Sequence, residues 1–176
     1  WYHEAVKFVS EHGLFKGISA DEFGPDIPIT RGMFVTILSR LEFGGDDGVP
    51  DLESPFVDLE QNWYKKAVAW AYENRITLGI SATEFDPDGI LTREQMAVFL
   101  YRYAQYKNYD LEYDGEVLVI FIDQDEVSGF ADPGLPWAVD QGLLTGTSAT
   151  VLAPKDQASR AQAAAIFMRF ASLFQD

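Results

Sequence analysis

The chain has 176 residues, 47% hydrophobic and 14% aromatic, which is enough apolar material for a packed core and excludes a disordered chain. Its 13 basic and 28 acidic residues give a net charge of −15, so nucleic acid and anionic membrane surfaces are poor partners. The absence of cysteine excludes disulfides, thiolate metal sites and cysteine nucleophiles. No apolar stretch is long enough to cross a membrane, so no membrane insertion is expected.

One pattern recurs three times along the chain. GISADEFGPDIPITRGM begins at Gly17, GISATEFDPDGILTREQ at Gly79 and GTSATVLAPKDQASRAQ at Gly146. The second copy follows the first at an offset of 62 residues, and the third follows 67 residues later. So many identities at fixed offsets indicate an internal repeat.

Each copy begins with a segment that predicts an amphipathic helix. These segments are 1–12, 63–74 and roughly 136–141. In the second copy Trp63, Ala67 and Trp70 recur at helical spacing. We expect Trp70, and Trp137 at the aligned position, to lie in the core.

A second helix is expected in each copy after a glycine-containing turn and a loop. Its N-caps are Thr30, Thr92 and Ser159. Gln95 and Gln162 complete capping boxes in the second and third copies, whereas the first copy has Met33 there.

The second helices share an apolar stripe at positions i, i+3, i+4 and i+7, which buries one face. The stripes are Phe34, Ile37, Leu38, Leu41, then Met96, Phe99, Leu100, Tyr103, then Ala163, Ile166, Phe167, Phe170. A single copy is too small to bury its own stripe. The predicted fold class is therefore mainly α, with three helix-loop-helix repeats around a central three-helix bundle of pseudo-threefold symmetry. We expect Ile37, Phe99 and Ile166 to meet at its centre.

Two linkers separate the copies. Residues 44–55 are rich in turn formers and expected to be exposed, whereas 107–120 leads into the apolar run 117–122, which we interpret as a buried strand or extended segment. The predicted organisation is repeat 1 at 1–43, repeat 2 at 56–106 and repeat 3 at 121–176, together one domain. Because the chain opens at Trp1 inside a repeat and without a signal peptide, we interpret it as an excised module whose first repeat is N-terminally incomplete.

The sequence FVDLEQNWYKKAVAWAYENRITLG, followed by FDPDGILTREQMAVFLYRY, resembles the S-layer homology motif, and the resemblance covers essentially the whole chain. Repeats of that family open on Phe-x-Asp, continue through a helix containing Trp, and end on a helix start similar to Thr-Arg-Ala-Glu. The resemblance implies a three-pronged spindle that binds a secondary cell-wall polymer, often pyruvylated, in grooves between adjacent prongs.

The resemblance also implies a set of glycan-binding residues. They are Arg31, Arg93 and Arg160 at the helix starts, Gly17, Gly79 and Gly146 with Ser19, Ser81 and Ser148 in the loops, and Asp58 and Asp123. Trp63, an aromatic residue at a helix start, is a further candidate for glycan binding. The first copy lacks the Phe-x-Asp opening, and the residues after each arginine depart from Ala-Glu. We therefore expect the three grooves to differ.

Each of these residues also has a purely structural interpretation. A ligand carboxylate could be held by the helix-start amides and the guanidinium together, or the arginine could form an ion pair with Asp26, Asp88 or Asp58 of another repeat. The serines could bond sugar hydroxyls or close turns, and Trp63 could stack on a sugar or pack in the core. Arg40, Arg102 and Arg169, near the helix C-termini, are expected to be structural.

The function implied by the resemblance is a non-catalytic, extracellular anchor that holds a larger protein on a Gram-positive cell surface. It requires no cofactor or metal, and the expected state is a monomer with an internal pseudo-trimer.

One alternative is a calcium-assisted protein-docking module, because Asp86-Pro87-Asp88-Gly89 and Asp123-Gln124-Asp125-Glu126 are rich in oxygen ligands, although neither completes an EF-hand. The other is a polysaccharide-active enzyme, for which no catalytic carboxylate pair stands out among 28 acids. His3 and His12 are expected to be solvated.

Overall fold

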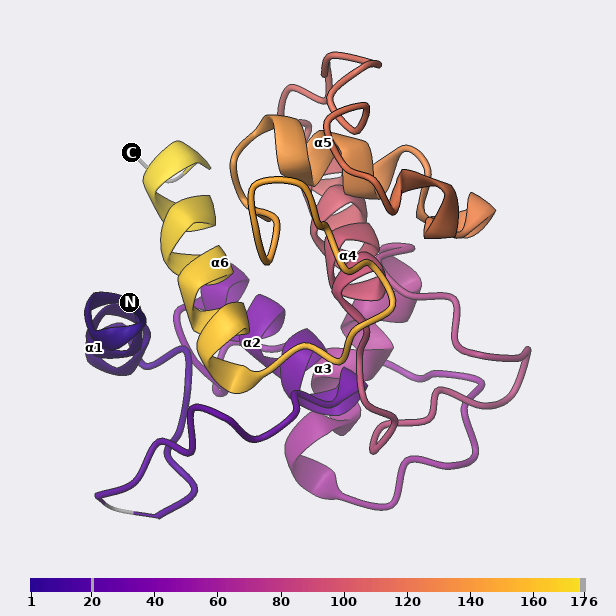
Figure 1. The fold of residues 1–176 in the computed structure, drawn as a ribbon. Coiled ribbons are helices and arrows are strands. Elements are labelled where there is room, and N and C mark those ends of the chain that lie inside the picture. Colours follow the sequence, from indigo (N-terminus) through magenta and orange to yellow (C-terminus); the bar gives the residue numbers. More distant parts are fainter. Residues whose placement is uncertain (20, 175–176) are drawn as a thin grey trace.

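A computed structural model of the chain describes residues 1–19 and 21–174 (Figure 1). Within this part the chain folds into α-helices joined by loops and short 3-10 turns, and it forms no sheet. The helices are α1 (His3–Glu11), α2 (Arg31–Phe43), α3 (Asn62–Glu73), α4 (Arg93–Tyr106), α5 (Gly134–Asp140) and α6 (Arg160–Phe174), with 3-10 turns η1 (Gln124–Glu126) and η2 (Gly129–Ala131). The prediction of a mainly α fold is confirmed.

The repeats are interlocked rather than stacked as separate units. The first helix of each repeat packs mainly on the second helix of the preceding repeat, so α3 lies on α2 and α5 lies on α4. The ring closes because α1 lies on α6, the last helix of the chain, as Figure 1 shows. Each repeat therefore depends on both of its neighbours for burial.

Local capping signals in the sequence are confirmed. The Thr92 hydroxyl accepts a hydrogen bond from the Gln95 amide at 3.3 Å, and the Gln95 side chain accepts one from the Thr92 amide at 3.0 Å. Ser159 and Gln162 make the same reciprocal pair. Thr30 caps α2 alone, through the Met33 amide.

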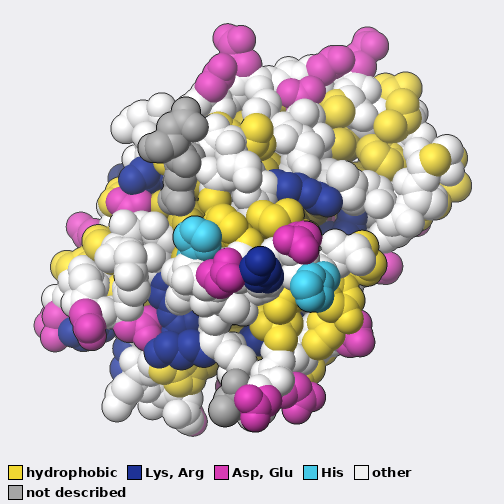
Figure 2. Space-filling view, turned by 90° about the vertical axis from the view of Figure 1, so that its left-hand side faces the viewer, with side chains coloured by type: hydrophobic (Ala, Val, Ile, Leu, Met, Phe, Trp, Pro, Cys, Tyr) yellow, Lys and Arg dark blue, Asp and Glu magenta, His cyan; other side chains and the backbone are white. Residues whose placement is uncertain are grey.

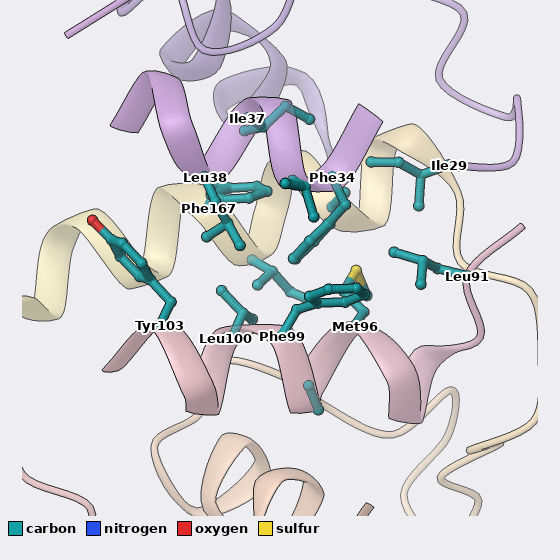
Figure 3. Packing of buried hydrophobic residues seen from close by; sticks show 14 of the residues in the cluster. Ile29, Phe34, Ile37, Leu38, Leu91, Met96, Phe99, Leu100, Tyr103 and Phe167 are labelled. Carbon is teal, nitrogen blue, oxygen red and sulfur yellow. The ribbon is translucent and has the colours of Figure 1, made fainter. Parts of the chain in front are cut away.

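The second helices α2, α4 and α6 form the central bundle, but its register differs from the expected one. The rings of Phe34 and Phe167 have centroids 5.0 Å apart, and Leu38, Leu100 and Phe167 are fully buried (Figure 3). Figure 3 also shows Ile37 on the other side of α2 from Leu38.

The residues expected at the centre lie at its rim instead. Ile37, Phe99 and Ile166 belong to the same core, yet each lines a different surface groove. Three side chains that each line a separate surface groove do not meet at the bundle centre, so the prediction of their mutual contact is wrong. These helices are buried on most of their circumference, so the stripe alone does not locate the bundle axis. Trp70 and Trp137 lie in the core as predicted.

A ring of backbone hydrogen bonds ties the three repeats together at the N-terminal end of the bundle. The amide of Ile29 donates to Ala158 O (2.9 Å), that of Ala158 to Leu91 O (2.9 Å) and that of Leu91 to Ile29 O (3.0 Å). All three residues are fully buried, so this closed ring is protected from water. It requires one strand-like segment from every repeat.

The apolar run 117–122 is not the buried strand that its composition predicts. It forms consecutive turns, in which the Val119 amide donates to Glu116 O at 3.0 Å, and Val119, Ile120 and Ile122 are mostly exposed. Only Phe121 is buried, in the position that Phe56 occupies in repeat 2. Hydrophobicity alone does not make a strand where no partner segment is available to pair with it.

The outer face of α1 is polar. Figure 2 shows acidic and basic side chains and the two histidines interspersed on this face, and His3 and His12 are both exposed, as expected. Among the helices in the described ranges, none combines the length and hydropathy that a membrane span needs.

Candidate functional site: three grooves between the repeats

Three related grooves lie around the bundle. Groove 1 lies between the 15–18 loop and α2, groove 2 between the 77–80 loop and α4, and groove 3 between the 143–147 loop and α6. Their volumes are about 380, 440 and 330 Å³, within the range of small-ligand sites.

Each groove is assembled from all three repeats. The loop and helix come from one repeat, a helix-start arginine comes from the repeat before it, and an aromatic side chain comes from the repeat after it, counted around the ring. The arginines of grooves 1, 2 and 3 are Arg160, Arg31 and Arg93, and the aromatic residues are Trp63, Phe130 and Trp1. The grooves can therefore form only when the whole ring is closed.

The helix-start arginines join neighbouring repeats through main-chain carbonyls. Nε of Arg31 donates to Phe85 O (2.7 Å) and Nε of Arg160 donates to Phe23 O (2.9 Å). Nε of Arg93 donates to Leu152 O at 3.1 Å. The alternative of an inter-repeat ion pair is wrong for the described residues, because these arginines form no salt bridge there.

The amides of the same helix starts are already occupied. Those of Arg31 and Gly32 donate to Gly89 O (2.9 Å) and Pro87 O (2.8 Å) of the next repeat, and α4 and α6 make the equivalent pairs. The expectation that helix-start amides and guanidinium bind one ligand carboxylate together is therefore wrong for the amides. Their hydrogen-bonding capacity is satisfied by the neighbouring loop, which leaves the guanidinium groups as the cationic part of each groove.

Aromatic rings cover the faces of two of these guanidinium groups. The Arg31 guanidinium carbon lies 4.8 Å from the ring centroid of Phe85, and that of Arg160 lies 4.7 Å from Phe23. Each arginine is at most 8% exposed, and burial lowers the pKa of Arg31, Arg93 and Arg160 because the charged form is desolvated. An anion in the groove would offset that desolvation.

Glycine is required where the loops approach the grooves. Gly79 has φ +79°, and a Cβ there would contact the Phe56 ring and the carbonyl oxygens of Ser81 and Glu84. Gly17 and Gly146 are enclosed in the same way, and all three glycines line their grooves. At these three positions the loops thus present backbone rather than side chain to a ligand.

The loop serines lie beside the grooves rather than in their walls. The hydroxyls of Ser81 and Ser148 accept hydrogen bonds from the amides two residues further on, Thr83 and Thr150, at 3.3 and 3.4 Å. Ser19 is exposed, and its amide donates to Glu22 O at 3.4 Å. These contacts close turns, and a role in binding sugar stays a prediction.

The Phe-x-Asp carboxylates organise the loops. Asp58 accepts hydrogen bonds from the amides of Phe85 (3.0 Å) and Asp86 (2.7 Å), and Asp123 accepts them from Leu152 (2.9 Å) and Ala153 (2.7 Å). These amides lower the pKa of Asp123. Asp58 thus holds the segment whose Phe85 carbonyl accepts from Arg31, and Asp123 holds the segment whose Leu152 carbonyl accepts from Arg93. Both carboxylates therefore position residues around a groove.

The aromatic side chains at the groove openings could be found only partly from the sequence. Trp63 is 48% exposed and lines groove 1, whereas its neighbour Tyr64 is buried. Phe130, 55% exposed, lines groove 2 in the equivalent position. Phe130 follows Trp63 at the repeat offset of 67 residues, so the sequence does contain this signal. The prediction that the first helix of the third copy begins near residue 136 left Phe130 outside the aligned segment.

Arg40, Arg102 and Arg169 also line the three grooves, in equivalent positions. Arg40 donates to Asp46 and to Leu14 O, and Arg169 donates to Leu143 O at 3.0 Å, so both hold their own repeat together as expected. Arg102 differs, because it makes no side-chain hydrogen bond or ion pair within the described part of the chain. No hydrogen bond or ion pair of the described residues therefore supports the structural role predicted for Arg102.

The oxygen-rich loops are closed by their own main chains. The Gly89 amide donates to Asp86 O at 3.1 Å, and Asp123 precedes the 3-10 turn η1. Across 1–19 and 21–174, no group of three or more carboxylate or histidine side chains is placed to hold a metal ion.

This geometry is that of a domain built from three repeats, with a related surface groove at each repeat. The model of the S-layer homology domain family matches the chain at residues 1–32, 55–97 and 121–164. The chain belongs to the S-layer homology domain family.

Relatives of this chain include both surface proteins and enzymes. It is 33% identical over 172 residues to the surface-layer 125 kDa protein of Lysinibacillus sphaericus, a match over 94% of this chain and 14% of the relative. It is 31% identical over 169 residues to an endoglucanase of Bacillus sp. strain KSM-635 (94% of this chain, 17% of the enzyme). It is 26% identical over 104 residues to a cellulosome-anchoring protein of Acetivibrio thermocellus (58% of this chain, 23% of that protein).

The chain spans less than a quarter of the length of each of these relatives. Its similarity to the endoglucanase is thus confined to a small part of that enzyme. The family match, with relatives named as surface-layer and anchoring proteins, supports a cell-surface location.

Proposed function

We propose that this chain is a non-catalytic anchoring module that binds a secondary cell-wall polysaccharide, in pyruvylated form, in its grooves. By doing so it holds a larger protein on the surface of a Gram-positive bacterium. It acts as a monomer, because the three repeats within one chain already close the ring.

The observation that carries this proposal is the threefold repetition of one groove. Each groove combines a buried guanidinium, a glycine loop that exposes backbone, and an exposed aromatic ring at its opening. An aromatic face suits the apolar side of a pyranose ring, and a guanidinium suits a carboxylate. A polymer with a repeating unit can occupy more than one groove, which raises its overall affinity through effective concentration.

Because the net charge of the chain is −15, binding of an acidic polymer requires cationic side chains at the binding site itself. The protein as a whole repels an acidic polymer, so binding has to come from guanidinium groups in desolvated grooves, where charge interactions are stronger than in water. The arginines of the three grooves meet this requirement.

Cell-wall sacculi provide the test. The purified chain is mixed with sacculi from a Gram-positive wall, pelleted and quantified, before and after the secondary polymer is removed by mild acid. We expect the chain to sediment with intact sacculi and to remain in solution with stripped ones.

Two further arms separate the alternatives. Binding that disappears when EDTA is added would favour the calcium-assisted docking module. Retention by stripped sacculi would contradict the polymer as ligand. Release of reducing sugar from the sacculi during incubation would favour a polysaccharide-active enzyme.

A further inference from the structure

The three grooves share one design but differ in how their cations are compensated. Each groove is lined by a helix-start arginine and a second arginine from the bundle helix, which gives the pairs Arg160 with Arg40, Arg31 with Arg102, and Arg93 with Arg169. The partners of these second arginines decide how much positive charge is free for a ligand.

In groove 1 the second arginine is paired with a carboxylate that lies beside the groove. Asp46 accepts from Nε of Arg40 at 2.6 Å and from Nζ of Lys16 at 2.6 Å, so one carboxylate serves both cations. These contacts lower the pKa of Asp46, and Arg40 also donates to Leu14 O. In addition, Arg160 uses two guanidinium nitrogens on main-chain carbonyls, of Phe23 and Lys16.

Groove 3 is intermediate. Arg93 donates from Nε to Leu152 O and from Nη2 to Thr145 O, and Arg169 donates to Leu143 O. Its loop places Thr145 and Thr147 in the wall, so the surroundings of the cations are polar.

The two arginines of groove 2 make the fewest hydrogen bonds of the three pairs within the described residues. Among the described residues, Nε is the one guanidinium nitrogen of Arg31 that donates a hydrogen bond, to Phe85 O, and Arg102 donates none. Repulsion from Arg102 contributes to the lowered pKa of Arg31, after desolvation, while Asp86 and Asp58 oppose it. Desolvation also lowers the pKa of Arg102. Two like charges are thus held close in one groove at a cost that an anion would remove.

Groove 2 also carries exposed apolar side chains beside its two cations. Leu78 and Ile80 are 55% and 59% exposed at the loop, in the positions that Lys16 and Ile18 occupy in groove 1, and Phe130 lies at the opening. Exposed apolar side chains beside two guanidinium groups match a ligand with a methyl group next to its carboxylate. A pyruvate ketal on a sugar has that chemistry.

We propose that groove 2 is the principal acid-recognising groove of this chain, in which Arg102 acts with Arg31 to hold the carboxylate of a ketal-bearing sugar. This inference rests on the proposed function, because it names the groove and the residue that select the acidic unit. Arg102 determines specificity, and the equivalent Arg40 is occupied by Asp46.

The test uses two probes: the methyl glycoside of a pyruvate-ketal hexosamine, and the methyl ester of the same compound, which lacks the negative charge and carries one additional methyl group. Each is titrated calorimetrically onto the full 176-residue chain and its variants. We expect the acid to bind at least about tenfold more tightly than the ester, since charge-assisted hydrogen bonds are lost with the ester.

Arg102→Ala is the informative variant, and Arg169→Ala is its matched control at the equivalent position of groove 3. We expect Arg102→Ala to weaken binding of the acid about tenfold to a hundredfold. Binding of the ester should change little, and so should the melting temperature, because Arg102 has no hydrogen-bonding partner to lose. Arg102→Lys should restore part of the affinity, and Arg169→Ala should cost less than about threefold.

Equal binding of acid and ester, no binding of the acid by the wild type, or a larger loss in Arg169→Ala than in Arg102→Ala would overturn this inference. The proposed function is tested separately, by sedimentation of the chain with cell-wall sacculi. Retained sedimentation of Arg102→Ala with intact sacculi, together with any of these outcomes, rejects groove 2 while leaving the anchor in place. Failure of the wild type to sediment with sacculi rejects both.

Discussion

A chain that ends at Lys107 is expected to be unfolded or aggregated instead of forming a two-repeat domain. The deletion removes α5 and α6, so α4 and α1 both lose the helix against which they pack. Phe34 loses Phe167, whose ring centroid lies 5.0 Å away, and Ile29 loses the Ala158 carbonyl of the backbone ring. Repeats that bury their core only against neighbours do not persist without them.

Circular dichroism during heating and sedimentation velocity measure the effect of this deletion. The full chain, treated identically, should melt in one cooperative transition as a monomer. A truncated chain that is also monomeric and melts cooperatively would show that the first two repeats do not need the closed ring.

Replacing Arg31 by alanine is expected to reduce both the stability of the fold and the affinity for the wall polymer. The substitution leaves Phe85 O without its buried donor and exposes the ring that the guanidinium covers. Loss of a hydrogen bond to a charged group costs about 1.5–3 kcal/mol. From the sequence alone, a cation in the first helical turn is mildly unfavourable, which predicts that its removal leaves stability almost unchanged. The contact with Phe85 O reverses that expectation.

A chemical denaturation curve and a polymer titration of the same preparation separate the two effects of this substitution. Lys7→Ala is the matched control, because Lys7 is an exposed cation on α1 outside the grooves and should change the free energy of unfolding by less than about 0.5 kcal/mol. Arg31→Lys should recover part of the affinity but less of the stability, since an ammonium lacks the planar fork. Unchanged stability in Arg31→Ala would mean that the contact with Phe85 O contributes nothing to folding.

Much of the fold could be predicted from local signals in the sequence. The N-caps at Thr30, Thr92 and Ser159 set where the bundle helices begin, because a side-chain acceptor satisfies amides that the helix leaves free. The repeat offsets placed the arginines and glycines at equivalent points. These features depend on a few adjacent residues, so they can be recognised without knowledge of the tertiary structure.

Features that depend on packing between repeats could not be predicted in the same way. The repeat pattern in the sequence does not predict that α1 packs on α6, or that the helix-start arginine of one repeat lines the groove of the next repeat. The contact partners of Asp58 and Asp123 lie 27 to 30 residues away in the chain, which hid their part in loop geometry. Nor does composition show that Asp46 neutralises Arg40, whereas Arg102 has no such partner in the described ranges.

The most direct test of the account uses the four tryptophans as internal reporters. Trp1 and Trp63 are exposed at groove openings, whereas Trp70 and Trp137 are buried in the core. Polymer released from the wall is titrated onto the ¹⁵N-labelled chain, and the indole N–H resonances are followed by NMR. If the polymer binds in the grooves, the resonances of Trp1 and Trp63 and of the loop amides at Gly17, Gly79 and Gly146 will shift with the titration, while those of Trp70 and Trp137 stay fixed. Shifts confined to the outer faces of α1 and α3, with the groove resonances unchanged, would contradict binding in the grooves.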